Sequence, residues 1–171
     1  VIGLGSGDFT VYDDPDGEYL YLLYNLIHVD MRGGVWKSCD TCIARTRKRK
    51  DGIMGDFVKY YDGSFCEAGN LGKETPIVRN AWHSRVCFSK ELNAYLMASS
   101  PVIPDNPLTV VADYLELRTS SDLLSWSEPV PVMKEGKKFG SHYHTLLSYL
   151  GRDEPQKISG GQFTLLCGHN G

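Results

Sequence analysis

The sequence of 171 residues lacks the patterns that long helices and membrane spans require. Apolar residues nowhere recur at the helical period of about 3.6 over a capped stretch, so long α-helices are not expected. No apolar run approaches the roughly 20 residues that a membrane-spanning helix needs, and no signal peptide is recognisable. The patterns therefore argue against a helical fold and predict no membrane partner.

The sequence also has no excess of positive charge. Its 18 Lys and Arg residues stand against 21 Asp and Glu residues, which gives a formal net charge of −3. Proteins that bind nucleic acids usually carry a basic patch, so no nucleic-acid partner is predicted. The one basic run, residues 45–50, precedes Asp51-Gly52. This context favours a solvated turn, and a contact with phosphate or a partner is the alternative.

Cysteine is present in an odd number, five, so the thiols cannot all pair within the chain. Cys39 and Cys42 have the CxxC spacing of a redox motif or a zinc half-site, but no second CxxC follows. Residues three apart in a strand point to opposite faces, which favours buried free thiols. Free thiols weakly favour a reducing compartment such as the cytoplasm. Beyond that preference, the sequence leaves the location unknown.

Signatures of several enzyme classes are missing as well. The chain has no glycine-rich phosphate loop, no serine nucleophile elbow and no HExxH pattern on a helix. Each of these motifs supplies a specific chemistry, namely phosphate binding, acyl transfer or zinc-dependent hydrolysis. No cofactor is therefore predicted.

The sequence does contain a recurring strand–turn–strand unit. Copies run over residues 8–24 and 84–98, and a looser copy runs over 143–167. In the first copy, Asp16-Gly17 lies between two apolar runs, which is a strong hairpin signal. A unit that returns every 60 to 75 residues, roughly, is typical of a radial or stacked β architecture.

Extending the units gives an all-β domain over 1–171, built from β-propeller blades of four antiparallel strands. The blades fall at about 1–80 and 81–140, with an incomplete one at 141–171. Connections in such an array alternate between two faces, and the long loops with chemical side chains gather on one of them. The residues that open each first strand would lie together there, beside the axis. They are Asp8, then Trp82 and His83, then His142, Tyr143 and His144.

Three segments resemble five-bladed β-propeller glycosidases of the group that includes glycoside hydrolase families 43 and 32. They are Gly7-Asp8-Phe9, Tyr12 to Gly17, and Leu117 to Pro129. The resemblance implies a carbohydrate substrate. Five blades normally need about twice this length. The resemblance therefore also implies about half of a five-bladed propeller, with the remainder supplied by sequence outside this chain.

The implied reaction is hydrolysis of a glycosidic bond in an oligo- or polysaccharide by general acid/base catalysis at the propeller axis. Such hydrolysis needs two carboxyl groups. The resemblance implies that Asp8 is the axial catalytic carboxylate, and a cap before a strand is the alternative interpretation. The general acid stays unassigned, because the matching strand starts carry histidines. The rim carboxylates considered for it are Glu67, Glu74 and Asp113.

Several other side chains are candidates for contact with the substrate. His83, His142 and His144 can hydrogen-bond a sugar hydroxyl, shuttle a proton, bind a metal or line a wet channel. Substrate or water contact is favoured, so no metal is predicted. Trp36 and Trp82 can stack on sugar rings. The remaining candidates are Arg32, Arg79 and Asp113.

An arginine fork can select an acidic sugar, although Arg32 and Arg79 equally suit loop salt bridges. A non-catalytic carbohydrate-binding or scaffold propeller is the alternative function for the whole chain. Axial carboxylates in the remaining half of the propeller, outside this chain, would favour the enzyme. Their absence there would favour the binding protein.

Overall fold

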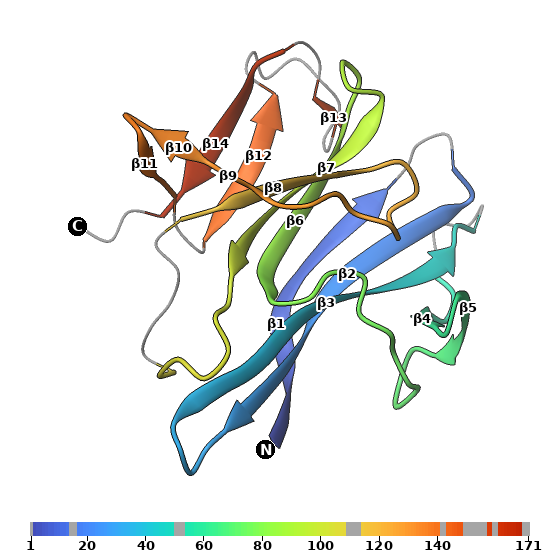
Figure 1. Ribbon diagram of the computed structural model, residues 1–171. Helices are drawn as coiled ribbons and strands as arrows, with labels where there is room; N and C mark the ends of the chain where they lie inside the picture. Colours follow the sequence, from blue (N-terminus) through green and yellow to red (C-terminus); the bar gives the residue numbers. More distant parts are fainter. Residues whose placement is uncertain are drawn as a thin grey trace.

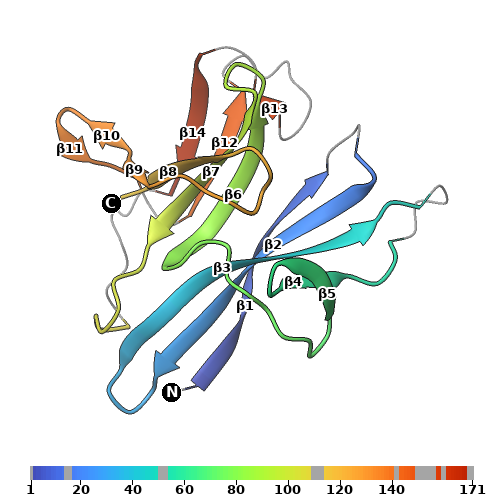
Figure 2. The same cartoon turned by 45° about the vertical axis from the view of Figure 1, so that its right-hand side comes forward.

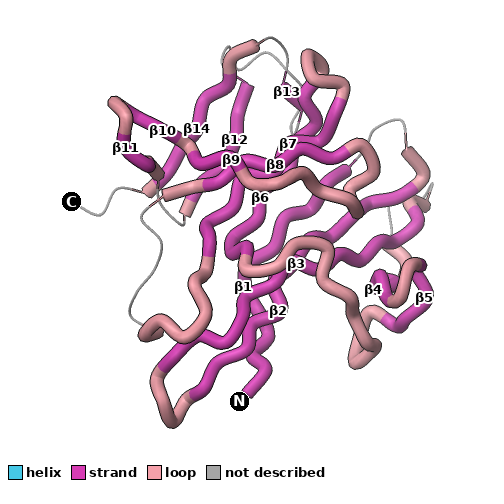
Figure 3. The backbone as a smooth tube through the Cα atoms, viewed as in Figure 1, coloured by secondary structure: helices cyan, strands magenta, loops and turns pink. Residues whose placement is uncertain are grey.

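The computed structural model describes residues 2–13, 17–49, 54–108, 114–140, 143–148, 157–158 and 161–168, with side chains from residue 8 onward. All regular elements in these ranges are strands (Figure 3), which confirms the predicted all-β class. Nothing in the described ranges forms a helix long and apolar enough to cross a membrane. The strands are β1 (Ile2–Asp13), β2 (Tyr19–Asp30), β3 (Val35–Arg47), β4 (Val58–Tyr61), β5 (Ser64–Ala68), β6 (Ala81–Ser89), β7 (Ala94–Pro101), β8 (Glu116–Ser120), β9 (Val130–Pro131), β10 (Met133–Lys134), β11 (Lys137–Lys138), β12 (His144–Ser148), β13 (Lys157–Ile158) and β14 (Phe163–Cys167).

The first sheet is antiparallel and has the order β1-β2-β3-β4-β5. Its three long strands cross the molecule, and the short β4–β5 hairpin continues the sheet so that it curls into a half-barrel (Figures 1 and 2). β2 lies between β1 and β3 and is apolar on both faces over residues 19–24. A strand of this kind is stable only when both its faces are covered, at least in part.

The second sheet has the order β13-β6-β7-β8-β9. β6 to β9 are antiparallel neighbours, whereas β13 joins β6 in parallel, with Lys157 opposite Phe88 and Ile158 opposite Ser89. Two smaller two-stranded sheets, β10–β11 and β12–β14, complete the described strands. Figure 2 shows the second sheet beside the half-barrel, with β6 nearest to β1 and β2.

The prediction of a β-propeller is wrong. Two five-stranded sheets, one of them a curled half-barrel, take the place of repeated four-stranded blades. The predicted units of residues 81–140 and 141–171 also exchange strands, because β13 pairs with β6 while β12 and β14 pair with each other. The repeat identifies hairpins, which are local, but the arrangement of sheets depends on contacts between distant segments. The resemblance to propeller glycosidases, and with it the half-propeller interpretation, is withdrawn.

The core lies between the two sheets. Tyr12, Leu23 and Ile43 from the half-barrel pack on Val86 and Met97 of the second sheet, and all five are buried. The Tyr12 ring also meets the Tyr95 ring edge-on at 5.3 Å. Each large side chain buried in this way stabilises the fold by about 1.5–3 kcal/mol. Trp126 packs against the same cluster.

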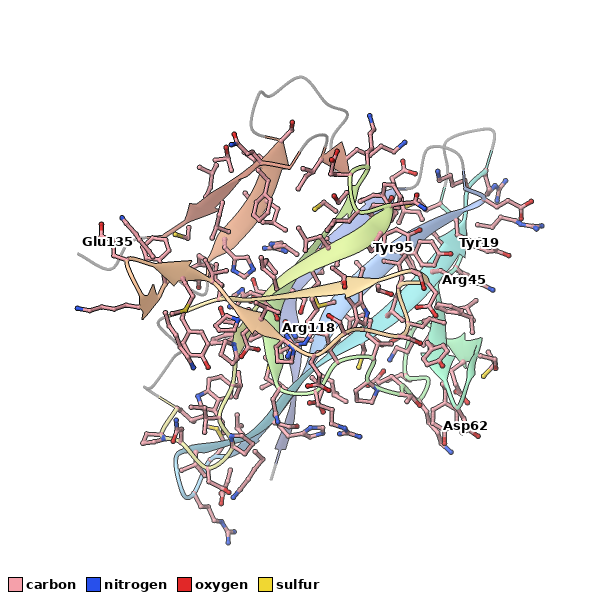
Figure 4. The ribbon with its side chains drawn as sticks, turned by 45° about the horizontal axis from the view of Figure 1, so that its top comes forward. Tyr19, Arg45, Asp62, Tyr95, Arg118 and Glu135 are labelled. Atoms are coloured by element: carbon pink, nitrogen blue, oxygen red, sulfur yellow. The ribbon has the colours of Figure 1, made fainter. Side chains whose placement is uncertain are left out.

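The burial of Cys39 and Cys42 agrees with the sequence-based interpretation, whereas residues 45–47 of the basic run belong to β3 rather than to the predicted turn. Cys39 and Cys42 are free and buried, and burial raises the pKa of Cys42 to about 12. At the far end of the half-barrel, the Arg45 guanidinium lies 4.1 Å from the Tyr19 ring centre (Figure 4). Arg47 pairs with Glu18 at 2.9 Å on the exposed surface. Through these contacts, Arg45 and Arg47 lie at the solvated end of β3.

Candidate functional site

Two β-bulges bring Asp8 and His83 together. The register of β1 shifts between Gly5 and Phe9, and that of β6 shifts between Trp82 and Arg85. Such bulges bend a strand and redirect its side chains. The backbone of His83 also has a φ of +55°, in the left-handed region that residues other than glycine seldom occupy. A conformation of this kind persists only where the surroundings hold it in place.

Asn25 of β2 holds the β6 bulge. Its Oδ1 accepts a hydrogen bond from the His83 backbone N–H at 3.1 Å. Its Nδ2 donates to the carbonyl of Ala81 at 2.8 Å. Asn25 is buried, so this one amide satisfies the backbone on both sides of Trp82. An amide can do this because it carries a donor and an acceptor side by side.

Two threonines extend this contact across the half-barrel. Thr41 Oγ1 of β3 donates to the Ala81 carbonyl at 2.9 Å and lies 2.6 Å from Ser84 Oγ. Thr10 Oγ1 of β1 donates to the Ser84 carbonyl at 2.7 Å. All three long strands of the half-barrel therefore hydrogen-bond the same four-residue stretch of β6. This buried polar seam fixes the position of His83 relative to β1.

The Asp8 carboxylate reaches the imidazole across the sheet interface. Asp8 Oδ1 lies 3.3 Å from His83 Nδ1. The side chain of His83 is 1% exposed and that of Asp8 is 32% exposed. The imidazole is thus sealed from water, while the carboxylate has one side open to it. A ligand from solution would meet Asp8, and His83 would orient that carboxylate from behind.

Aromatic rings surround the imidazole. The ring centre of His83 lies 4.3 Å from that of Trp82 and 5.0 Å from that of Tyr143. Trp82 in turn packs on the buried Trp36, with ring centres 5.2 Å apart. Tyr143 is 60% exposed, although its ring contacts a buried histidine. The open side of Asp8 is therefore accompanied by an accessible aromatic ring.

The other predicted site residues are more scattered. His144 is buried and its Nε2 lies 2.9 Å from the Ala98 carbonyl, so it is fixed against β7. Arg32 is exposed in the β2–β3 turn, away from the bulges along the strands. His142 and Asp113 lie outside the described residues. The structure therefore brings Asp8, Trp36, Trp82 and His83 into one cluster and leaves Arg32 apart.

The carboxylates that were considered for the general acid lie in other contacts. Glu74 forms an ion pair with Lys59, and Glu67 accepts a hydrogen bond from the Lys73 backbone at 3.2 Å. Arg79, considered for selecting an acidic sugar, pairs with Asp40 at 3.3 Å. Across the described ranges, no group of three or more His, Cys, Asp or Glu residues is arranged to hold a metal ion.

Asn25 and Tyr143 are the functional candidates that the sequence analysis missed. Asn25 lies outside the strand-opening positions that the sequence analysis considered, in the middle of β2. The signal was present, since Asn25 is the one amide on the buried face of an otherwise apolar strand. Tyr143 was placed near the axis as a neighbour of two histidines, without a role. Only its exposure beside the imidazole distinguishes it.

Comparison with protein-family models and with curated protein sequences finds no match. Among solved structures, the chain is similar to an N-acetylgalactosamine deacetylase from F. plautii, which was crystallised in complex with blood group B trisaccharide. The sequence identity is 11% and the TM-score is 0.49. The match covers 81% of this chain and 40% of the deacetylase chain. This chain thus corresponds to less than half of that protein.

Proposed function

We propose that the chain binds carbohydrate at the Asp8–His83 site. The supporting observation is the pairing of a half-open carboxylate with a buried imidazole, next to an exposed tyrosine ring. Asp8 would accept hydrogen bonds from sugar hydroxyls, and Tyr143 would pack against the apolar face of the sugar ring. Few, well-placed polar groups beside aromatic surface are the usual composition of a ligand site. The TM-score of the deacetylase is too low to add to this argument.

The preorganisation of Asp8 supports this role. A carboxylate that is held by a buried partner keeps its orientation before the ligand arrives, so less conformational freedom is lost on binding. His83 is itself fixed by Asn25 and by the packing of Trp82. In this proposal Trp82 and His83 position Asp8 and do not contact the ligand themselves. The substrate contacts of Arg32, His142, His144 and Asp113 stay predictions.

Glycoside hydrolysis is a second candidate, and the Asp8–His83 contact is the observation in its favour. A carboxylate 3.3 Å from an imidazole nitrogen can exchange a proton with it and serve as a general base. Hydrolysis also needs a second carboxyl group about 5–9.5 Å from the first. Glu67 and Glu74 are engaged elsewhere, so neither of these two candidates supplies that group. Binding therefore needs fewer additional groups than hydrolysis does.

A panel of neutral oligosaccharides, followed by calorimetry with the tightest ligand, tests the proposal. Tyr143→Ala should weaken binding about tenfold, since stacking is lost, whereas Tyr143→Phe should bind like the wild type. Equal affinity in all three proteins would remove Tyr143 from the site. If no oligosaccharide binds, the proposed function fails.

Asp8→Asn separates binding from hydrolysis. The amide keeps the shape and one hydrogen-bond acceptor but loses the negative charge. For a binding site, affinity should fall about tenfold. For a hydrolase, the rate should fall by roughly 10² to 10⁴ with a smaller change in affinity. Asp13→Asn, on the same strand and largely exposed, is the matched control and should change neither quantity.

A further inference from the structure

The half-barrel carries a second candidate site on its concave face. Phe9, Val11, Leu20, Leu22 and Leu26 line a cavity of about 1330 Å³ there. Side chains alternate along a strand, so these residues face away from Asp8, Thr10 and the second sheet. The opposite wall comes from residues 54–59 and 66–70. The lining of this cavity shares Asn25 with the residues that position His83 in the proposed carbohydrate site.

One wall of the cavity carries a compact polar group. The Lys59 ammonium pairs with the Glu74 carboxylate and donates to the Gly72 carbonyl at 3.0 Å. The Tyr24 hydroxyl donates to Glu74 Oε2 at 3.2 Å. Lys59 and Glu74 are both more than four-fifths buried, so their charges cancel within the wall. This polar group offers a hydroxyl oxygen and a carboxylate as acceptors, and Asp56 and Glu67 on the opposite wall make the lining negative overall.

Shape and charge together define the occupant. A flat sheet or a second half-barrel would contact only the rims of a concave surface, whereas a narrow molecule can lie along β2 beneath the β4–β5 hairpin. An anionic ligand would lose its hydration without gaining a counter-charge, because Glu74 already neutralises Lys59 and because Asp56 and Glu67 add negative charge. An uncharged ligand avoids this cost. Its single hydrogen-bond donor would find acceptors at Tyr24 and Glu74.

We propose that the concave face of the half-barrel binds an elongated, uncharged apolar molecule with one terminal hydroxyl. The apolar chain lies along Leu20, Leu22 and Leu26. The hydroxyl donates a hydrogen bond to the Tyr24 oxygen or to the Glu74 carboxylate. Both faces of β2 are then covered, one by the core and the other by the ligand.

Displacement of the neutral dye Nile red by 1-decanol tests this proposal on the 171-residue chain. Decanol should displace the dye saturably, and decanoate at pH 8 should do so at least tenfold more weakly. Tyr24→Phe should weaken decanol about fivefold, as expected for the loss of one hydrogen bond, and leave the affinity for Nile red unchanged. Similar affinity for decanol and decanoate, or no saturable displacement, would overturn the proposal.

A charge placed in the wall provides the second test. Leu22→Glu should abolish dye binding, whereas Leu92→Glu, at an exposed leucine of the β6–β7 turn, should not. Cys66 is an exposed thiol that also lines the cavity, so its alkylation reports on ligand binding without any substitution. Decanol should slow its alkylation by iodoacetamide in the wild-type chain. Unchanged alkylation, or a dimer that Leu22→Glu dissociates, would contradict a small-molecule site.

Discussion

Asp8 Oδ1 lies 3.3 Å from His83 Nδ1, and each residue belongs to a bulge in a different sheet. The contact therefore depends on how the two sheets are joined. Hydrogen bonds from Thr10, Asn25 and Thr41 fix that junction, and the left-handed backbone of His83 depends on it. The carboxylate is held in place by a seam that runs across three strands. A change in the seam should consequently alter both the stability of the fold and the site.

Asn25→Ala should lower the free energy of unfolding by about 3 kcal/mol. The change leaves the His83 N–H and the Ala81 carbonyl buried without their amide partner, and each such loss costs about 1–3 kcal/mol. Urea unfolding followed by circular dichroism measures the effect. Asn70→Ala, at an exposed loop position, is the control and should stay within about 0.5 kcal/mol of the wild type. A loss below 1 kcal/mol for Asn25→Ala would show that the seam is not needed.

The hairpins of this fold could be predicted from the sequence because their signals are local. The predicted first hairpin is the pair β1–β2, which sets Tyr12 opposite Tyr21. The turn at 90–93 joins two strands that set Phe88 opposite Tyr95. The arrangement of the sheets could not be predicted, since the parallel pairing of β13 with β6 joins segments about 70 residues apart. Periodicity in one strand carries no information about such a partner.

The site was predictable in part for a related reason. The repeat predicts that Asp8, His83 and Tyr143 open equivalent strands and converge, and the structure places the Asp8 and Tyr143 side chains beside the His83 imidazole. The predicted cause, a propeller axis, is wrong. The bulge at His83 has no sequence signal, because no glycine stands at this left-handed position, whereas Gly5 and Gly7 precede the bulge at Asp8. Asp8 and Tyr143 are partly exposed to solvent whereas His83 is buried, and this difference in exposure depends on the whole fold.

Tyr12→Ala should cost about 3–5 kcal/mol of unfolding free energy, because it empties a fully packed position between the sheets. Tyr19→Ala removes the same kind of side chain from the first residue of β2, where the ring contacts Arg45 (Figure 4). That cation–π contact contributes only about 0.5–1 kcal/mol at an exposed site. Chemical denaturation of the two variants compares them directly. Equal losses of unfolding free energy in the two variants would contradict the assignment of Tyr12 to the core.

Asp122 should make the fold sensitive to acid. Burial acts to raise the pKa of its carboxyl group, but hydrogen bonds from the Ser125 and Leu124 N–H groups at 2.7 and 2.8 Å, with one from the Ser120 hydroxyl, outweigh it. The folded pKa is therefore lower than that of the unfolded chain. The resulting stabilisation is complete above the unfolded pKa of about 3.9 and is lost as the pH falls through the folded pKa.

Urea midpoints measured from pH 6 to pH 2 test this behaviour. Asp122→Asn should flatten the decline of stability below pH 4, because the amide does not titrate. Asp62→Asn, at the exposed tip of the β4–β5 hairpin (Figure 4), is the matched control and should follow the wild-type curve. A wild-type slope in Asp122→Asn would assign the acid sensitivity to other carboxyl groups.

The central claim is that an oligosaccharide contacts the Asp8 carboxylate that His83 holds. The most direct measurement is the ¹⁵N resonance of the His83 imidazole Nδ1 during titration with the tightest oligosaccharide. The account predicts a saturable shift with the dissociation constant found by calorimetry, and its loss in Asp8→Asn. Saturable binding that leaves the His83 resonance unmoved would contradict the account.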